Sequence, residues 1–471
     1  MIKKIALLVL AVFCHQQSRA QVTVKKGVII DSLKINDSIS DTYALYLPKA
    51  FEMVGNWPII YVFDMKGRGK QALGMFLNTA EKSNYILVAP NNILDTLSIT
   101  DNLIKTKQLI ENSSAMFPIN RSRIYTAGHQ NNARFANLIP VFMKNVTGVI
   151  SIGASVANVE LLSNKNPFHF IGVVGTGDFN YTNLLQDEKV LNKLKMQNNV
   201  FLYEGGNEWP SSSMIDRAVS YFDLSAMAKG ILTKDSLLIN QYYQAELSHI
   251  NALQQNKQLI MAERAMTETV TGFRNLLNTD SLSNALRSLR KSKSYKGKQR
   301  EEKAARFKEM LLRDDYIYYL EEDVLTYNFN NLGWWNYQMT QLDGYINGQN
   351  YANQQMGKRL LSFVNALVED NIVLIKNAAM VDEEALAFLL MLKTITDPTN
   401  FENYLKVVSL AAKNNDFGTA LYYLEEVLKK GYNDLDALYS LEHTVLFRIT
   451  PEFNELVKKY LNDARYEIKD E

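Results

Sequence analysis

Cysteine is almost absent from this sequence: Cys14 is the one cysteine among 471 residues. It lies in an N-terminal segment that we expect to be cleaved, so the mature chain is predicted to contain no cysteine. Such a chain has no disulfides and no thiol chemistry. Its hydrophobic content of 47% predicts a globular protein that depends on its buried core, and its length predicts two or three domains.

A large net charge is also absent. The 51 lysines and arginines and the 50 aspartates and glutamates leave a net charge of +1. No basic tail or stripe stands out, so neither nucleic acid nor an anionic membrane is expected as a partner. The sequence has no Gly-x-x-x-x-Gly-Lys, Gly-x-Gly-x-x-Gly or His-Glu-x-x-His motif. Acidic runs such as residues 321–323 are interpreted as solvated helix faces, and no cofactor or metal is expected.

Long apolar runs are missing except at the N-terminus, where residues 5–13 follow two lysines. This run is shorter than the about 20 residues that a membrane span needs. With the small residues Ser18 and Ala20 behind it, it predicts a signal peptide over residues 1–20. The mature protein is then expected to be exported, to the periplasm or the extracellular space, without an integral membrane segment. Lipidation at Cys14 is disfavoured because a bulky phenylalanine precedes it.

Residues 21–229 alternate short β-branched and aromatic runs with helical patterns. Continuous apolar strands such as PIIYVFD predict a sheet that is covered on both faces, which favours parallel pairing with crossover helices. We therefore predict an α/β domain with a mainly parallel sheet and flanking helices. The predicted strands are residues 22–30, 41–47, 58–64, 85–90, 123–127, 148–153, 168–175 and 199–204, and the predicted helices are 70–83, 101–116, 132–144, 181–197 and 211–229.

The composition changes after residue 229. Seven of the nine prolines lie before this point, and beyond it strand patterns vanish while Leu, Ala, Lys, Glu and Gln dominate. This composition predicts an all-helical domain over residues 230–395. The polar stretch SKSYKGKQREEK, residues 292–303, is interpreted as a solvated helix start in preference to a linker.

Residues 396–471 have a sharper helical pattern. Apolar residues recur on one face and then on the opposite face, with alanines where two helices must approach closely. This pattern resembles a tetratricopeptide helix pair, followed by a short capping helix in TPEFNELVKKYLNDA. The alternative is an antiparallel helical hairpin in an all-α bundle. The residues that carry the pattern are Tyr404, Val407, Ala411, Ala420, Leu424 and Val427.

The stretch RIYTAGHQNNARFA, residues 123–136, reads as a strand, a tight turn and a helix. It resembles the Gly-x-Ser-x-Gly segment of secreted serine esterases of the α/β-hydrolase family, which includes polyhydroxybutyrate depolymerases. Gly128 then matches the first glycine, Gln130 the serine and Asn132 the last glycine. The resemblance implies that an amide stands where the nucleophile would be.

Two later segments extend the resemblance in the chain order that the fold requires. VVGTGDFNY, residues 173–181, resembles the acid loop and puts Asp178 at the triad acid. EGGNEWP, residues 204–210, resembles the loop of the catalytic histidine and puts Asn207 at that histidine. FDMKGRG, residues 63–69, resembles the loop that supplies one oxyanion amide.

Neither replacement can perform the triad chemistry, because an amide has no ionisable proton to transfer near neutral pH. We therefore expect a degenerate triad of Gln130, Asp178 and Asn207 without efficient turnover. Two geometric expectations follow: Asn207 donates a hydrogen bond to Asp178, with Gln130 within reach, and Asn132 tolerates the turn that a glycine would favour. Candidate binding residues near the old pocket are His129, Asn131, Trp209 and Asp64.

Two functions stay open. The first is an exported pseudo-hydrolase that binds a protein, peptide or glycan without catalysis. The second is an esterase-like hydrolase that uses other residues, such as Ser155, Ser211 or His249, although a lone helical histidine is more often a solvated surface residue. An ester assay with identification of the reactive residue distinguishes the two.

Overall fold

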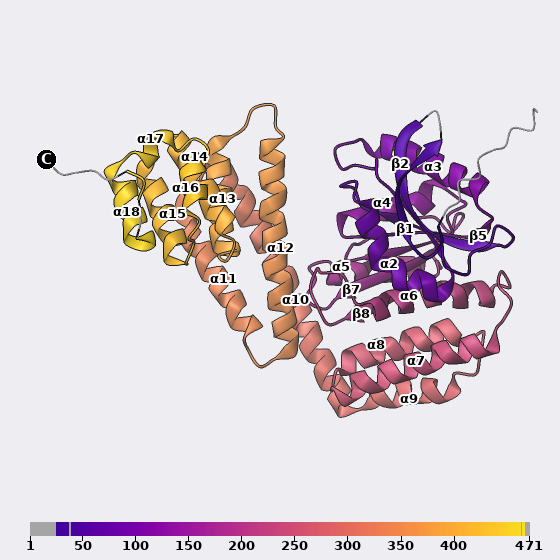
Figure 1. The fold of residues 1–471 in the computed structure, drawn as a ribbon. Helices are drawn as coiled ribbons and strands as arrows, with labels where there is room; N and C mark the ends of the chain where they lie inside the picture. The colour runs from indigo at the N-terminus through magenta and orange to yellow at the C-terminus, as the bar shows by residue number, and fades with distance from the viewer. Residues whose placement is uncertain (1–24, 37–38, 463, 467–471) are drawn as a thin grey trace, which may run out of the picture. The chain divides into compact units, whose positions relative to one another are not determined.

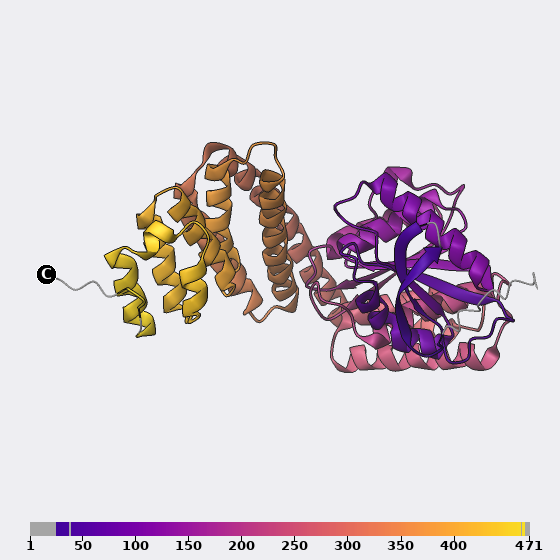
Figure 2. The same ribbon diagram turned by 45° about the horizontal axis from the view of Figure 1, so that its top comes forward.

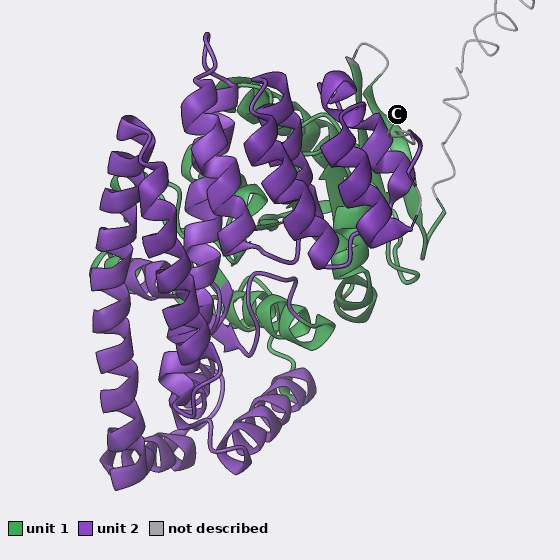
Figure 3. Cartoon of the chain, turned by 90° about the vertical axis from the view of Figure 1, so that its left-hand side faces the viewer, with its two compact units in different colours: residues 1–172, 189–199, 211–236 green, residues 173–188, 200–210, 237–471 purple. Residues whose placement is uncertain are grey.

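The computed structural model describes residues 25–36, 39–462 and 464–466. The predicted signal peptide, with Cys14, lies outside the described residues. The chain forms two compact units (Figure 3): unit 1 comprises residues 1–172, 189–199 and 211–236, and unit 2 comprises residues 173–188, 200–210 and 237–471. These units are not contiguous in sequence, whereas the predicted domains are, so the boundaries at residues 229 and 395 stay predictions.

Eight strands form one mixed sheet in the order β1-β2-β4-β3-β5-β6-β7-β8 (Figures 1 and 2). Strand β2 pairs antiparallel with β1 and β4, whereas the β4-β3, β3-β5 and β5-β6 pairs are parallel. The prediction of a mainly parallel sheet is thus confirmed. The strands are β1 (Ile29–Asn36), β2 (Ile39–Tyr46), β3 (Trp57–Phe63), β4 (Ile86–Pro90), β5 (Ile119–His129), β6 (Gly148–Ile152), β7 (His169–Gly175) and β8 (Asn198–Tyr203).

The first strand lies later in the chain than predicted. We expected it at residues 22–30, but β1 begins at Ile29. Gly27 has a φ of +74°, which interrupts extended backbone, and the residues after it pair with β2, Ile29 lying opposite Tyr46. Pairing with a neighbouring strand, which the local pattern does not contain, sets where this strand starts.

Helices cover both faces of the sheet in unit 1. Side chains alternate between faces along a strand, and Tyr61 and Phe63 of β3 contact Ser113 of α3 and Phe135 of α4, respectively. These two helices therefore share one face. On the other face, Tyr125 of β5 stacks on Phe222 of α6 with 3.9 Å between ring centroids, and α6 packs against α2. The helices between β3 and residue 228 are α2 (Gly69–Ser83), α3 (Ile99–Met116), α4 (Asn131–Phe142), η1 (Val159–Leu161), α5 (Tyr181–Lys193, of which residues 181–188 belong to unit 2) and α6 (Ser212–Ala228). The α-helices among them lie within a few residues of their predicted positions.

From α7 onward, the described part of the chain is helical, as predicted. Most of its helices pack against the next one or the next but one along the chain. In the part of the chain that is described, no helix is both long and apolar enough to cross a membrane. The helices are α7 (Ser236–Gln255), α8 (Leu259–Phe273), α9 (Asp280–Lys291), α10 (Lys293–Thr326), η2 (Phe329–Asn331), α11 (Leu332–Ile346), α12 (Tyr351–Lys376), α13 (Glu383–Thr396), α14 (Phe401–Lys413), α15 (Phe417–Lys429), α16 (Leu435–Ser440), α17 (Val445–Arg448) and α18 (Pro451–Leu461).

The polar stretch at residues 292–303 is a helix start. Ser292 caps α10 by accepting a hydrogen bond from the backbone N–H of Tyr295 at 3.2 Å. A serine at this position satisfies one of the amides that a helix leaves unpaired at its beginning. The local chemistry was therefore sufficient to locate this helix.

The C-terminal helix pair is present at the predicted place. Helices α14 and α15 pack against each other, and all six residues of the predicted apolar pattern are buried. Asn400 and Asp416 cap the two helices by accepting hydrogen bonds from backbone N–H groups. The predicted capping helix is α18, which Thr450 caps. The tetratricopeptide resemblance itself stays a prediction.

Candidate functional site

The turn between β5 and α4 has the strained geometry of a nucleophile-presenting turn. Gln130 has φ 53° and ψ −124°, a backbone conformation that residues other than glycine rarely adopt. The Gln130 N–H donates to the Ile152 carbonyl at 2.8 Å, and its own carbonyl accepts from Ala133 N–H at 2.8 Å. Such strain costs about 1–3 kcal/mol and persists where the surroundings over-determine it.

The strained residue is Gln130 and not Asn132. We expected Asn132 to adopt the turn conformation that a glycine favours, but Asn132 is the second residue of α4 and does not have a positive φ. The helix begins immediately after Gln130, so the change of chain direction is concentrated at Gln130. The expectation for the backbone of Asn132 was wrong.

The position two residues before Gln130, occupied by Gly128, has no room for a side chain. A Cβ atom at this position would lie 2.6 Å from the carbonyl carbon and oxygen of Asn132 and 2.7 Å from the amide nitrogen of Ala133. Backbone atoms of the new helix cannot move away as a flexible side chain can. The first glycine of the predicted motif is therefore a steric requirement of this strand-to-helix turn.

The side chain of Asn132 connects this turn to the loop after β3. Its Oδ1 atom accepts a hydrogen bond from the Met65 backbone N–H at 2.8 Å. The register of the parallel β3-β5 pair, with Phe63 opposite Gly128, brings the two loops to the same end of the sheet. A glycine in place of Asn132 would leave this N–H without that partner.

Other amides of the loop after β3 are also occupied. Those of Lys66 and Gly67 donate to Asp64, and that of Gly69 donates to the Asn91 side chain. The second carboxylate oxygen of Asp64 forms an ion pair with Arg68 at 2.9 Å. Asp64, a predicted binding residue, thus organises its own loop, and the amides of Met65, Lys66, Gly67 and Gly69 all have protein partners.

The other predicted residues of this turn differ in exposure. His129 and Gln130 are half-buried at the end of β5, and Asn131, the first residue of α4, is exposed. These residues belong to unit 1, whereas Asp178 and Asn207 belong to unit 2. A shared site of Gln130 with Asp178 and Asn207 stays a prediction.

The acid loop and the loop after β8 run side by side in unit 2. Thr176 N–H donates to the Tyr203 carbonyl at 2.9 Å, and Gly177 N–H donates to the Gly205 carbonyl at 2.8 Å. A Cβ atom on Gly175 would lie 2.5 Å from the Gly205 oxygen, so the two backbones approach as closely as glycine permits. The segments that carry Asp178 and Asn207 are thus neighbours, as the resemblance implies.

Asp178 is buried, with 1% of its surface exposed. Its Oδ1 accepts from the Asn180 N–H at 2.7 Å, and its Oδ2 has no hydrogen-bond partner among the described residues. The pKa of Asp178 is raised to about 7, mainly by burial; the Asn180 amide opposes this shift, the nearby Glu208 adds to it, and Arg313 opposes it. This carboxyl group therefore titrates near neutral pH.

The predicted hydrogen bond from Asn207 to Asp178 is not among the hydrogen bonds that Asp178 forms in the described structure. Asn207 is exposed while Asp178 is buried, and a backbone amide already serves Oδ1. That expectation was wrong because a loop amide supplies the donor in place of a side chain. Trp209 is half-buried and Pro210 is buried.

Two arginines of the helical part hold the acid loop, and sequence reasoning missed them. Arg359 of α12, 1% exposed, donates to the Thr176 carbonyl at 2.7 Å and to Glu309 of α10 at 2.8 Å. Arg313 donates to the Phe179 carbonyl at 2.6 Å and forms an ion pair with Glu309 at 3.0 Å. The four-residue spacing of Glu309 and Arg313 suggests a helical ion pair, but no local signal indicates Arg359.

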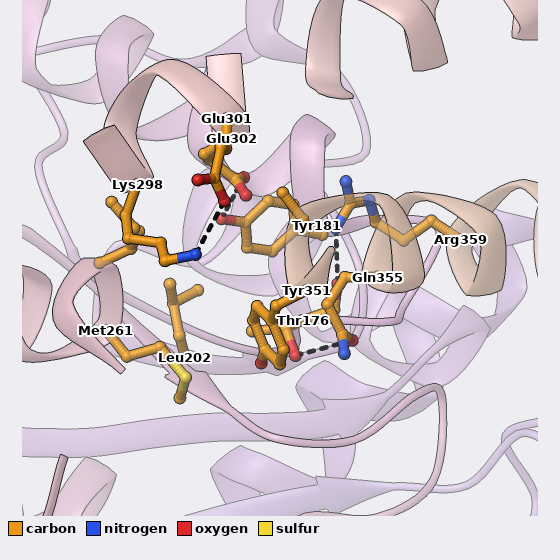
Figure 4. A pocket seen from close by; sticks show the side chains of 12 residues that line it. Thr176, Tyr181, Leu202, Met261, Lys298, Glu301, Glu302, Tyr351, Gln355 and Arg359 are labelled. Atoms are coloured by element: carbon orange, nitrogen blue, oxygen red, sulfur yellow. Dashed lines mark hydrogen bonds and ion pairs between the residues drawn. The ribbon is translucent and has the colours of Figure 1, made fainter. Parts of the chain in front are cut away.

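A small pocket with apolar and charged lining residues lies beside Arg359 (Figure 4). Tyr181 O–H donates to Glu302 at 3.1 Å, Lys298 pairs with Glu301 at 2.9 Å, and Arg359 also lines the pocket. Its volume is about 40 Å³. Since one water needs about 10–15 Å³ by the same measure, the pocket has room for only a few waters and is too small for an ester substrate.

A larger groove of about 660 Å³ lies among η2, α11, α13, α14 and α15 in unit 2. Its volume is within the range of about 300–1,000 Å³ that is usual for ligand sites. Apolar side chains contribute much of its lining, whereas Glu384, Asp416 and the exposed Tyr422 add polar groups. Its apolar lining residues are Phe329, Leu332, Ala387, Met391, Val407, Leu410 and Ala411.

The other candidate histidines and serines differ in burial. His169 is buried, its Nε2 lies 2.8 Å from Asn199 Oδ1, and burial lowers its pKa to about 3. His249 is half-buried on α7 and is not the solvated surface residue that we expected. Ser211 is exposed and its Oγ lies 2.9 Å from that of Ser213. Ser155 is half-buried.

No cluster of three or more His, Cys, Asp or Glu side chains able to hold a metal ion occurs among the residues that the structure describes. No residue set on which a cofactor would depend was predicted from the sequence.

The fold is a mixed, mainly parallel eight-stranded sheet with flanking helices, followed by an all-helical region. No protein-family model matches the chain, and no curated protein matches it.

Solved structures that are similar include the serine hydrolase FphF of Staphylococcus aureus, with 11% identity, 42% of this chain and 99% of that chain covered, and a TM-score of 0.35. Est1E of Butyrivibrio proteoclasticus has 12% identity, coverage of 42% and 99%, and a TM-score of 0.34. The esterase Est2 of Thermogutta terrifontis has 10% identity, coverage of 44% and 94%, and a TM-score of 0.35. At these scores the likenesses carry no conclusion about function.

Proposed function

We propose that this protein is an exported, non-catalytic binding module in which a hydrolase-like fold has lost its chemistry. One observation carries the proposal. The strained turn that would present a nucleophile holds Gln130, and the Asn132 side chain accepts a hydrogen bond from the Met65 amide of the neighbouring loop. A loop amide of this kind is what an oxyanion hole requires to be free.

The replacements oppose each step of ester hydrolysis. A serine attacks because an imidazole removes its proton and later returns that proton to the leaving group. Gln130 has no hydroxyl, and Asn207, proposed to stand at the histidine position, cannot shuttle protons at neutral pH. Preserved turn geometry without these groups supports a scaffold that is kept for another purpose.

We propose that the groove of about 660 Å³ in unit 2 binds the ligand, a protein segment, peptide or glycan. Its apolar lining provides contact area, and Glu384 and Asp416 provide orientation at its polar positions. The location of the groove on helices, away from the degenerate turn in sequence, is consistent with binding that needs no hydrolase chemistry.

The test is labelling with a fluorophosphonate probe, together with turnover of a small chromogenic ester, on the purified full chain. We expect no label and no turnover above the buffer rate. The double variant Gln130→Ser, Asn207→His is expected to regain labelling weakly, because the Met65 amide is still occupied. Adding Asn132→Gly frees that amide and is expected to raise the rate by about 10²–10³-fold, the usual contribution of one oxyanion donor.

Wild-type labelling at an identifiable serine, such as Ser155 or Ser211, would instead establish the alternative esterase-like hydrolase. Asn131→Ala in the double variant is the matched control for Asn132→Gly, since Asn131 is an exposed neighbour on the same helix. Equal rates for these two triple variants would contradict the role given to Asn132.

A further inference from the structure

Helix α10 has an exposed apolar stripe on the side away from its buried residues. Phe307 is 61% exposed, Tyr318 is 58% exposed and Leu325 is 77% exposed, and Leu311 is exposed as well. Isolated exposed apolar residues are ordinary, but a contiguous set on one element marks an interaction surface. The opposite face of α10, with Ala305, Tyr316 and Leu320, belongs to the core that it shares with α12.

The stripe follows the spacing of a helix–helix seam. With Asp314 and Glu321, its residues occupy positions 307, 311, 314, 318, 321 and 325, which are separated alternately by four and three residues. At 3.6 residues per turn this places them on one line along the helix, about 27 Å long. Such alternation is the heptad pattern by which one helix receives another.

From residue 314 onward the charges along the stripe are of one sign, whereas Lys308 flanks its first residue, Phe307. Asp314 and Glu321 lie within it, Asp315 and Glu322 flank it, and all four are exposed. None of these four side chains forms an ion pair or hydrogen bond with the rest of the described chain. From residue 314 to residue 326 the helix contains no lysine or arginine.

We propose that this face of α10, defined as Phe307, Leu311, Asp314, Tyr318, Glu321 and Leu325, binds a basic amphipathic helix of a partner protein. Apolar side chains of the partner would cover the aromatic and leucine residues, and its lysines or arginines would pair with the carboxylates. Two copies of the face would bring Asp314 and Glu321 against like charges, so a self-interface is disfavoured. Anionic lipid is disfavoured for the same reason.

This inference goes beyond the proposed function and does not depend on it, since it needs neither the groove nor the loss of hydrolase chemistry. This face lies on helix α10 alone, and no residue of the degenerate turn belongs to it. A failure of either proposal therefore leaves the other standing.

The probe is a fluorescein-labelled 18-residue helical peptide with leucine at heptad positions a and d and lysine at e and g, titrated with the full chain by fluorescence anisotropy. We expect saturable binding at least tenfold tighter than that of the same peptide with glutamate in place of lysine. A permuted peptide of equal composition without an apolar face is also expected to bind at least tenfold more weakly. Rising salt is expected to weaken binding, since exposed charges are screened.

Tyr318→Ser is expected to weaken binding at least tenfold. The matched control is Tyr337→Ser on α11, because Tyr337 is exposed to the same 58% and lies outside the stripe; its effect should stay below twofold. Asp314→Asn with Glu321→Gln should weaken binding and flatten its salt dependence. Circular dichroism checks that each variant is folded.

Three outcomes would overturn the inference. One is no binding of the lysine peptide, and another is equal loss of binding in Tyr318→Ser and Tyr337→Ser. The third is a concentration-dependent dimer in sedimentation that Tyr318→Ser removes, since this would make the face an interface between copies of the chain.

Discussion

The buried carboxyl group of Asp178 makes stability depend on pH in a direction opposite to that of most aspartates. Its pKa in the folded protein is about 7, whereas its ordinary value is 3.8. Between these values the folded chain holds a proton that the unfolded chain has released, so stability falls as pH rises from about 4 to about 7. Above about pH 7 the Asp178 carboxyl group is ionised in both the folded and the unfolded state, and the folded protein bears the full energetic cost of the buried charge.

The magnitude follows from the difference of about 3 pH units between the two values. Each unit corresponds to about 1.4 kcal/mol, so the ionised carboxylate costs on the order of 4 kcal/mol at pH 8. Asp178→Asn removes the titration. Its carboxamide oxygen can keep the hydrogen bond from the Asn180 N–H, and its NH₂ group replaces Oδ2, which has no hydrogen-bond partner in the described structure. Any cost of that NH₂ group is the same at all pH values.

The assay is urea unfolding of wild type and Asp178→Asn between pH 4.5 and pH 8.5, followed by circular dichroism. We expect the variant to gain stability relative to wild type as pH rises, by about 3 kcal/mol over this range, because part of the total cost is already present at pH 4.5. Asp315→Asn, an exposed aspartate of α10, is the control and should show no such trend. Glu208→Gln removes a like charge and should lower the folded-state pKa of Asp178, so that the decline of stability with rising pH ends at a lower pH and is smaller than in wild type.

An Asp178→Asn effect of equal size at pH 5 and pH 8 would refute the reasoning, since it would mean that the carboxyl group is ionised across the whole range. A trend of the opposite sign would mean that Arg313 outweighs burial.

Two further predictions concern stability. Gly128→Ala should destabilise unit 1 by more than about 2 kcal/mol, because the Cβ atom of the new alanine would clash with the Asn132 backbone. Gly74→Ala, on a helix with open space around it, should instead stabilise the protein by about 0.5–1 kcal/mol. Thermal unfolding compares the two variants, and equal shifts of the unfolding temperature would contradict the steric argument. Arg359→Met leaves Glu309 with one arginine fewer in a buried site and should cost about 3–5 kcal/mol in urea unfolding. Adding Glu309→Leu should recover only part of this loss, because Arg313 then lacks its partner Glu309. An Arg359→Met variant as stable as wild type would contradict a structural role for the pair.

The strands and helices of residues 41–228 were predictable because their signals are local. Apolar runs mark buried strands, and helical periodicity marks the α-helices between them, whose hydrogen bonds join residues four apart. The first strand was displaced because its limits depend on pairing with β2, a partner that the local pattern does not contain.

Part of the candidate site was likewise predictable from the sequence, and part was not. The spacing of Gly128, Gln130 and Asn132 identified the strand-to-helix turn, because a glycine at a tight turn is a local steric requirement. The sequence did not show that Gln130 itself carries the positive φ, nor that Asn132 accepts a hydrogen bond from Met65, 67 residues earlier in the chain. The wrong expectation of an Asp178–Asn207 hydrogen bond has the same origin: side chains were paired by analogy before their burial was known.

Residue order alone determined the alternation of strands and helices, the change to an all-helical composition after residue 229, and the absence of a serine and a histidine at the aligned positions. Only tertiary structure decided that Arg359 reaches the Thr176 carbonyl across 183 residues of sequence, that Asp178 is buried, and that one face of α10 remains uncovered. The physical reason is that backbone periodicity acts over a few residues, whereas burial and long-range hydrogen bonds depend on which distant surfaces the packed core brings into contact.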